Sequence, residues 1–410
     1  MRRPYAPLLR CALLLGLLLA SVSCGEPEKD KVTIMVPWSG TEFAAFYAVV
    51  KDFERDHPGI DVEPQVTRAL TQQLDAAVAA DAKPDLAVLP SVGAITKYRE
   101  ERDLLKLDVD TDAYVQPFRG LGMNGEDVYA VPVKADVKSL IWYDARSTAR
   151  PAESWTALRA GSYRWCLGLE SGPTSGWPGA DWIADILLSD ADAGTYTAWA
   201  SGAKAWDKGP VEDAWTTWGN LVADSLEDAS TLNFRDAGRS MTTKGCSLSH
   251  GALSAMPFES DQVRDDQYTY VPSSRDALEV SADFVGKFTR SKSADEFIRY
   301  LASTEAQRVW VNQPGFALSA DKKVTEYDNT TQGRIAGILR SSRYTLCFSA
   351  ADAMDPDVSA AFYRAVLDYA NGKKPTPLLA ALNKVQNELG YASPQSPPPP
   401  KPLCGTPNPH

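Results

Sequence analysis

Histidine is scarce in this chain of 410 residues, which has only His57, His250 and His410. The three lie far apart, and the chain has neither a His-Glu-x-x-His motif nor paired Cys-x-x-Cys motifs, so no metal-ligand spacing is present. A Gly-x-Ser-x-Gly nucleophile turn and a phosphate-binding glycine loop are missing as well. We therefore expect no catalytic residue, no metal site and no cofactor.

Clustered positive charge is also missing. The chain has 42 Lys and Arg against 53 Asp and Glu, for a formal net charge of -11, and it has no run of basic residues. Nucleic-acid binding needs such clusters to neutralise phosphates, so nucleic acid is excluded as a partner. The length exceeds one typical hydrophobic core, which favours two lobes or domains.

Long apolar runs are absent except for one near the N-terminus. Arg2, Arg3 and Arg10 are followed by the apolar residues 11–20 and then by small residues. This run is too short to span a bilayer, which requires about 20 apolar residues. A positive segment, a short apolar segment and small residues are typical of a cleaved export signal.

The residue after these small side chains is Cys24, and its placement resembles a bacterial lipobox, in which the thiol is acylated and the chain is cut just before it. This predicts a lipoprotein signal peptide over 1–23, a tether over 24–31 and a lipid anchor in the membrane. Ser21 departs from the pattern, which usually has Leu, Val or Ile there. The alternative is an ordinary secretory signal cut near Ser23.

Four cysteines remain beyond Cys24, and export makes disulfides plausible because exported proteins meet oxidising surroundings. Four cysteines allow three pairings, among which sequence cannot decide. We favour Cys166–Cys246 within one lobe and Cys347–Cys404 fastening the C-terminal tail. The alternative is four buried thiols.

Alternating strands and helices are predicted in the first part of the mature chain. Residues 32–36, 60–66 and 85–89 have the apolar, β-branched composition of strands, and two helical patterns separate them, the second over 69–82. This β-α-β-α-β order predicts an α/β fold with a mostly parallel sheet and helices on both faces. Ligands of such sheets bind beyond the carboxyl ends of the strands.

Later segments are predicted to be mainly helical. Ser293 and Glu296 have the spacing of a capping box that opens a helix, and further helices are predicted over 360–370 and 378–389. Residues 394–410 are Pro-rich without periodicity, so we expect this tail to be extended or disordered.

Tryptophan is abundant, with eleven residues. Trp38 follows the first predicted strand and Trp177 lies between glycine and proline, so we interpret both as ligand contacts. Aromatic rings pack on the apolar face of a sugar while polar groups bond its hydroxyls. Trp142 and Trp165 lie in apolar runs and are interpreted as core residues. Helical spacing favours a packing role for Trp199, Trp206, Trp215 and Trp218.

Carboxylates in the aromatic-rich stretch allow a second hypothesis. Glu170, Asp181 and Asp185 could supply the two carboxyl groups of a glycoside hydrolase, which are separated by about 5 to 10 Å. The simpler interpretation is that these groups bond sugar hydroxyls or cap helices.

Several segments together resemble a known family. They are the Pro-Trp-Ser-Gly turn at 37–40, the strand at 84–90, the segment 129–143 and, above all, the Glu-Ser-Gly…Gly-Trp-Pro…Asp-Trp block within 165–182. The chain is similar to bacterial extracellular solute-binding proteins (family 1) of carbohydrate ABC transporters, and among them to α-glucoside-binding proteins. The resemblance covers roughly residues 31 to 390.

The resemblance implies a two-lobe periplasmic-binding-protein-like fold of the maltose-binding type, with a ligand cleft between lobes joined by hinge crossings. It assigns 31–134 and 275–320 to the first lobe and 135–274 and 321–393 to the second. It implies an exported, membrane-anchored monomer that binds a carbohydrate, an α-glucoside or other oligosaccharide, and delivers it to the permease subunits of an ABC importer. A non-sugar solute is the alternative ligand.

The resemblance also implies a set of ligand-binding residues. The Cys246–His250 stretch departs from the family at Leu248, where an aromatic is expected, so His250 is either a ligand contact or a satisfied interior histidine. The residues carried over are Trp38, Ser39, Lys134, Asp136, Lys138, Glu170, Ser175, Trp177, Asp181, Trp182 and His250.

Overall fold

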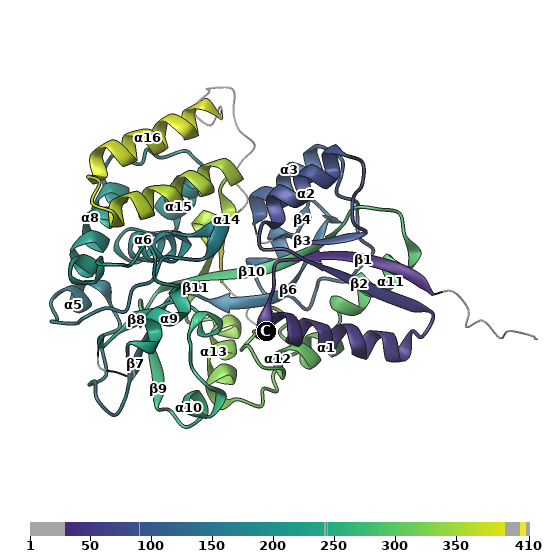
Figure 1. The fold of residues 1–410 in the computed structure, drawn as a ribbon, viewed down its shortest axis with the longest axis horizontal. Coiled ribbons are helices and arrows are strands. Elements are labelled where there is room, and N and C mark those ends of the chain that lie inside the picture. The colour runs from purple at the N-terminus through teal and green to yellow at the C-terminus, as the bar shows by residue number, and fades with distance from the viewer. Residues whose placement is uncertain (1–28, 90, 242, 244, 390–401, 407–410) are drawn as a thin grey trace, which may run out of the picture.

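The computed structural model describes residues 29–89, 91–241, 243, 245–389 and 402–406. Two lobes lie side by side, and long strands pass between them (Figure 1). The predicted signal peptide and Cys24 lie outside the described residues. Within the described part of the chain, no helix is long and apolar enough to cross a membrane.

One seven-stranded sheet extends through both lobes. Its order is β2-β1-β3-β10-β11-β12, with β6 paired to the other edge of β10. β1 is parallel to β2 and β3, which confirms the predicted alternation, whereas β10 is antiparallel to β3. The strands are β1 (Asp30–Val36), β2 (Ile60–Val66), β3 (Leu86–Leu89), β6 (Ala130–Val137), β10 (Ala277–Lys287), β11 (Thr345–Phe348) and β12 (Cys404–Gly405).

The long strand β10 joins the two lobes. Its residues 277–280 pair with β11, and its residues 284–287 pair with β3. β6 pairs with residues 280–286 of β10, across the passage from one stretch to the other. The predicted lobe boundaries fall inside β6 and just before β10, and they remain a prediction.

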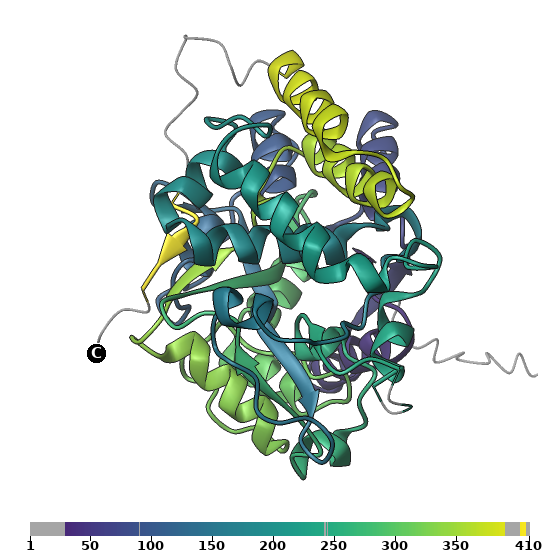
Figure 2. The ribbon, with the colours of Figure 1, turned by 90° about the vertical axis from the view of Figure 1, so that its left-hand side faces the viewer.

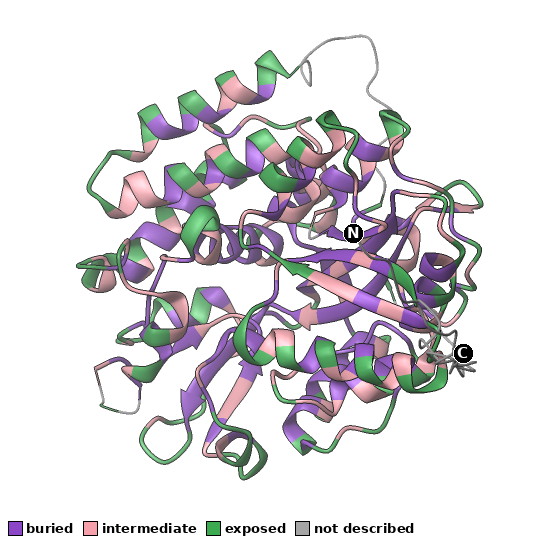
Figure 3. Cartoon of the chain, turned by 45° about the vertical axis from the view of Figure 1, so that its right-hand side comes forward, coloured by how far each residue is buried: buried purple, intermediate pink, exposed green. Residues whose placement is uncertain are grey.

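Helices cover both faces of the sheet in the first lobe (Figure 1). The first of them buries Phe46, Val49, Val50 and Phe53 at helical spacing, so one apolar stripe faces the strands. The strands are mostly buried, whereas the outer faces of the helices are exposed (Figure 3). The helices of this lobe are α1 (Gly40–Asp56), α2 (Leu70–Ala79), α3 (Val92–Glu100), α11 (Lys292–Leu301) and α12 (Thr304–Val311). The short α4 (Phe118–Leu121) comes after α3 in the chain and is followed by β4 (Met123–Asn124) and β5 (Asp127–Val128).

The second lobe is built around the buried helix α6, with a three-stranded sheet in the order β8-β7-β9. Its elements are β7 (Leu140–Asp144), β8 (Ser249–His250), β9 (Tyr268–Pro272), α5 (Trp155–Arg159), α6 (Trp177–Asp190), α7 (Ala193–Ala200), α8 (Pro210–Val222), α9 (Phe234–Arg239), α10 (Ser260–Arg264), α13 (Thr330–Arg340), α14 (Ala350–Ala353), α15 (Pro356–Ala370) and α16 (Pro375–Glu388).

The tryptophans predicted to pack inside the protein do so. Trp142 and Trp165 are buried. Phe362 of α15 has the rings of three further tryptophans around it at centroid distances of 4.9 to 5.7 Å. All four tryptophans predicted at helical spacing are fully buried, namely Trp199, Trp206, Trp215 and Trp218.

The predicted capping box at Ser293 is wrong. Helix α11 begins at Lys292, two residues before the start that this box implies, and the Ser291 side chain caps it by accepting a hydrogen bond from the Ala294 N–H. Ser293 lies in the first turn, where it is buried and donates to Asp30. Two serines two residues apart both fit a cap in sequence, and this contact with β1 selects the first.

Both favoured disulfides are present, Cys166–Cys246 and Cys347–Cys404. The second attaches the tail to the sheet, because Cys404 lies in β12, which pairs antiparallel with β11 (yellow arrow in Figure 2). Leu403 beside it is buried. The expected extended tail thus forms a short edge strand at 404–405, and residues 394–401 and 407–410 lie outside the described part.

Candidate functional site

Charged residues alternate along the end of β6. Lys134 and Asp136 are two residues apart, and Lys138 follows directly after the strand, so the spacing of two places all three on one face. The pairing of β6 with β10 shifts register between Asp283 and Phe284, which is a β-bulge. The bulge sets Lys134 opposite Asp283 at the passage between the lobes.

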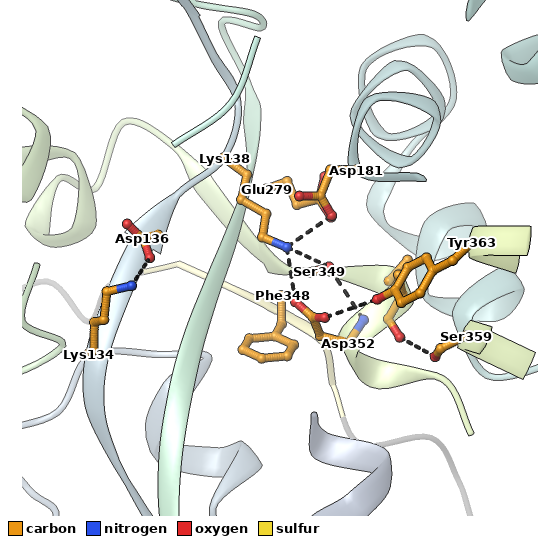
Figure 4. A network of polar contacts seen from close by, with 12 residues as sticks. Lys134, Asp136, Lys138, Asp181, Glu279, Phe348, Ser349, Asp352, Ser359 and Tyr363 are labelled. Carbon is orange, nitrogen blue, oxygen red and sulfur yellow. Dashed lines mark hydrogen bonds and ion pairs between the residues drawn. The ribbon is translucent and has the colours of Figure 1, made fainter. Parts of the chain in front are cut away.

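Lys138 is the centre of a buried polar network (Figure 4). Its Nζ donates to Asp181 Oδ1 at 2.9 Å, to Asp352 Oδ2 at 3.0 Å and to Ser349 Oγ at 3.3 Å. Burial alone would lower the pKa of Lys138, but Asp181 and Asp352 raise it well above its usual value. Lys138 is therefore held charged between two carboxylates from different helices.

The carboxyl groups around Lys138 bind protons more tightly than usual. Burial raises the pKa of Asp181 to about 7, although Lys138 opposes the shift. Burial and then Asp181 raise the pKa of Glu279 well above its usual value. Glu279 is fully buried, and its Oε2 has no hydrogen-bond partner within the described chain. Near neutral pH the cluster carries less negative charge than its number of carboxyl groups suggests.

A hollow of about 430 Å³, open solvent included, lies beside this network in the second lobe. The half-buried Trp177 meets Phe234 edge to face at 5.1 Å, and Lys138 Nζ lies 5.7 Å from the centre of the Trp177 ring. Aromatic faces beside a few polar groups are typical of small-molecule sites. The lining comprises Cys166, Leu167, Gly168, Trp177, Pro178, Asp181, Trp182, Phe234, Ser249, His250, Gly251, Ala255 and Met256.

Helix α6 supplies much of this lining because its first residues point toward the hollow. Gly176 precedes the helix with a φ of 103°, and a Cβ there would lie 2.1 Å from the Tyr363 carbonyl oxygen. Only glycine fits this close approach, which sets where the helix begins. Trp177, Asp181 and Trp182 then follow on the first turns.

His250 reaches the same hollow from β8. Its Nε2 lies 2.9 Å from Asp185 Oδ2, and its ring stacks on Trp182 with centroids 5.3 Å apart. Burial lowers the pKa of His250, although Asp185 opposes this shift, so the ring is neutral near pH 7. His250 therefore has an interior partner, as one interpretation predicts, and it also lines the hollow, while its contact with a ligand stays a prediction.

A smaller hollow of about 200 Å³, open solvent included, lies against the first lobe. Trp38 lines it but is only 3% exposed, with its Nε1–H donated to Asp283 Oδ2 at 2.8 Å. Its ring packs between Phe46 and Trp310. A ligand contact of Trp38 stays a prediction. The full lining is Trp38, Glu42, Ala45, Lys134, Trp310, Pro314, Gly315 and Ala317.

Glu42 connects the two lobes. It accepts a hydrogen bond from Lys134 at 3.0 Å and pairs with Arg235 of α9, in the other lobe, at 3.4 Å. Burial would raise the pKa of Glu42, but Lys134 and Arg235 together lower it, so it is ionised. Arg235 follows Phe234, which lines the larger hollow, and the ion pair thus links the two hollows.

The structure does not bring every predicted residue to a hollow. Ser39 is exposed at the start of α1 and makes no side-chain cap. Glu170 accepts from the Gly172 N–H at 2.8 Å and from Asn233 at 2.7 Å, so its oxygens hold the loop before α6. Ser175 bonds to backbone groups of the same loop. Asp136 accepts from Ser254 and pairs with Lys134.

Sequence reasoning missed several lining and network residues. They come from segments without a recognisable motif, and only folding brings them to the site. The alternating segment Lys-Ala-Asp-Val-Lys at 134–138 indicated a strand with one charged face. It did not indicate which residues would pair with these charges. The missed residues are Glu42, Phe234, Arg235, Met256, Glu279, Trp310 and Asp352.

The fold and the hollows define a class of protein. Two α/β lobes that share strands, each with a hollow against it, form a periplasmic-binding-protein-like fold of the maltose-binding type. The family described as bacterial extracellular solute-binding proteins matches residues 37–308, more than half of the chain. The chain belongs to this family.

Relatives and solved structures agree with this assignment. The chain is 27% identical to the α-glucosides-binding periplasmic protein AglE of Rhizobium meliloti (strain 1021), covering 87% of each chain. It is 26% identical to the osmoprotective compounds-binding protein GgtB of Synechocystis sp., covering 88% of this chain and 93% of the other. The solved bacterial solute receptor AcbH is similar in fold, with a TM-score of 0.74 and 14% identity over 88% of this chain and 98% of that chain.

Proposed function

We propose that this protein is an exported receptor that binds a sugar, an α-glucoside or another oligosaccharide, and delivers it to an ABC importer. The observation that carries the proposal is the larger hollow, where the Trp177 and Phe234 rings lie beside Asp181 and His250. Aromatic faces suit the C–H face of a sugar ring, and the polar groups suit its hydroxyls. The name of AglE, an α-glucosides-binding protein, supports a sugar as the ligand.

Within this proposal the predicted residues have different roles. Trp177, Trp182, Asp181 and His250 contact the ligand in the larger hollow. Lys138 holds Asp181 in place by a hydrogen bond, and its ammonium lies over the ring of Trp177. In the smaller hollow, Trp38 and Lys134 border the ligand, and the Glu42–Arg235 pair holds the lobes together around it. Glu170 and Ser175 shape the loop that begins α6, and we no longer expect them to contact the ligand.

A lipid at Cys24 would keep the receptor close to the permease that it serves. A tethered receptor meets its membrane partner at a raised effective concentration, which a diffusing one does not. We propose a monomeric receptor attached to the outer face of the cell membrane. Mass spectrometry of the native N-terminus tests the anchor, and an unacylated mature chain would leave export in place but remove the lipid.

A receptor binds without turnover, which separates it from a glycoside hydrolase. Incubation of the protein with maltose, trehalose and longer α-glucosides should return every sugar intact by chromatography, because Asp181 is paired with Lys138 and Asp185 is fully buried. Release of reducing sugar that disappears in Glu170→Gln would instead support the hydrolase. Binding of only amino acids or peptides would establish a non-sugar receptor.

Trp177→Ala is expected to weaken sugar binding by roughly 1 to 4 kcal/mol, the cost of truncating an aromatic anchor. The residue is half-buried at the first position of α6, so the fold should persist. Calorimetric titration of both proteins with the same sugar measures the loss. Tyr47→Ala removes an exposed aromatic of α1 and serves as the control. An unchanged affinity in Trp177→Ala would remove this residue from the site.

A further inference from the structure

The buried carboxylate of Asp185 receives several hydrogen bonds at once. Its Oδ2 accepts from the Trp155 indole N–H at 3.3 Å and lies 2.9 Å from His250 Nε2. Its Oδ1 is bonded to the Ser139 hydroxyl. Asp185 is fully buried on α6 behind the larger hollow, so solvent does not compete for these contacts.

The direction of two of these hydrogen bonds is fixed by chemistry. An indole N–H can only donate. The Ser139 hydroxyl accepts from the Glu279 backbone N–H at 2.6 Å, so its own hydrogen is free to be donated to Asp185. Each carboxylate oxygen of Asp185 therefore accepts a hydrogen bond, Oδ2 from Trp155 and Oδ1 from Ser139. The oxygen that accepts from Trp155 also faces His250 Nε2, so it is placed to accept from that nitrogen as well.

A neutral imidazole has one donor nitrogen and one acceptor nitrogen. The buried His250 is neutral near pH 7, and its Nε2–H donates a hydrogen bond to Asp185. Nδ1 is therefore the acceptor nitrogen. Within the described chain, no protein group is hydrogen-bonded to Nδ1, although the ring lines the larger hollow. An acceptor in a ligand hollow is suited to a hydroxyl that donates.

The neighbouring Trp182 supplies the complementary group. Its ring stacks on His250 with an interplanar angle of 22° and also lines the hollow. It is 2% exposed, and its Nε1–H has no partner within the described residues. The lining of the hollow thus contains one acceptor, His250 Nδ1, and one donor, Trp182 Nε1–H, which matches a hydroxyl, or two adjacent hydroxyls, because a hydroxyl both donates and accepts.

We propose that Asp185 is a positioning residue: it holds His250 as the Nε2-protonated tautomer, so that Nδ1 accepts a hydrogen bond from a ligand hydroxyl while Trp182 donates one. The inference rests on the proposed function, since it assigns His250 and Trp182 as the two groups of the larger hollow that hydrogen-bond a ligand hydroxyl. It distinguishes ligands that donate at this position from isosteres that only accept there, such as methyl ethers.

The tautomer can be measured without any ligand. Nitrogen-15 NMR of the histidine-labelled mature protein at pH 7, with His57→Gln and His410→Gln for assignment, should report His250 as neutral with the proton on Nε2. In Asp185→Leu the Nε2–H loses its acceptor, so the fraction of His250 protonated on Nε2 should fall. Asp190→Asn, on the same helix but paired with Arg159 near the surface, should leave the tautomer unchanged.

Binding adds the functional measurement, with maltose as the α-glucoside probe and its methyl ethers as comparison. Asp185→Leu should bind maltose about 5- to 150-fold more weakly, the range for an unpaired buried polar group. Asp190→Asn should bind it like the parent. A parent His250 protonated on Nδ1 or on both nitrogens, or an unchanged tautomer in Asp185→Leu, would overturn the inference. A parent with the expected tautomer that binds no sugar would overturn the proposed function instead.

Discussion

Lys138→Met is expected to lower the free energy of unfolding by about 3 to 5 kcal/mol, because removal of one partner leaves buried carboxylates without their counter-charge. Asp181 and Asp352 both depend on the Lys138 ammonium, and Glu279 lies in the same cluster. Urea denaturation at constant pH measures the change. Adding Asp181→Asn to the variant removes one unpaired charge and should recover part of the loss.

The deficit of Lys138→Met should grow with pH. In the folded protein the pKa of Asp181 is raised from 3.8 to about 7, so the folded state holds its proton longer than the unfolded state and loses stability between about pH 4 and 7. Without Lys138 this pKa rises further, and the loss continues above pH 7. We expect a larger difference from the parent at pH 8 than at pH 5.

Lys373→Met provides the matched control for this prediction. Lys373 is 61% exposed and pairs with Asp368 on the surface at 2.9 Å, where an ion pair contributes only about 0 to 1 kcal/mol. The fall in the free energy of unfolding caused by Lys373→Met should be small and nearly independent of pH. Equal effects of the two substitutions would contradict the account of Lys138 as a buried counter-charge.

Removal of the Cys166–Cys246 disulfide, by replacement of both residues with alanine, should lower the free energy of unfolding by about 4 kcal/mol. The bond closes a loop with a sequence separation of 80, and the loop-entropy model gives a loss of this size. The disulfide also lies next to the β-bridge between Trp165 and Leu248, and Cys166 lines the larger hollow. Sugar affinity should therefore fall too. Calorimetric unfolding and sugar titration measure the two effects.

The second disulfide offers a comparison of similar loop length. Cys347–Cys404 has a sequence separation of 57, for which the same model gives nearly the same entropy. Within the described residues, this bond fastens the short β12 and the buried Leu403 to β11 at the sheet edge, so the tail can detach while the lobes remain intact. We expect a smaller loss for the Cys347→Ala, Cys404→Ala variant. An equal or larger loss would mean that the tail supports the whole fold.

The fold was predictable where local patterns decide it. The strands β1 to β3 are short apolar runs separated by helical stripes, and their order requires parallel pairing. The start of α11 was not predictable from local pattern, because Ser291 and Ser293 both fit a cap and only the contact of Ser293 with Asp30 distinguishes them. The pairing of β12 was hidden inside a Pro-rich tail, where composition favours no strand.

The candidate site was predictable in part for the same reason. Trp177, Asp181 and Trp182 are neighbours on one helix, so a single segment carried them together. The partners of Lys138 and Glu42 come from segments far away in sequence, and only the folded chain shows Asp352 and Arg235 beside them. Glu170 fits a ligand contact in sequence, yet its oxygens are occupied by the loop that it holds.

The central claim is that this protein is a sugar receptor, and thermal unfolding of the mature chain with a panel of α-glucosides and other oligosaccharides tests it most directly. A ligand at 100 times its dissociation constant adds about 2.7 kcal/mol to the free energy of unfolding. We expect at least one sugar to raise the melting temperature, with the rise abolished or reduced in Trp177→Ala. No rise with any sugar, together with a rise from an amino acid or a peptide, would contradict the account.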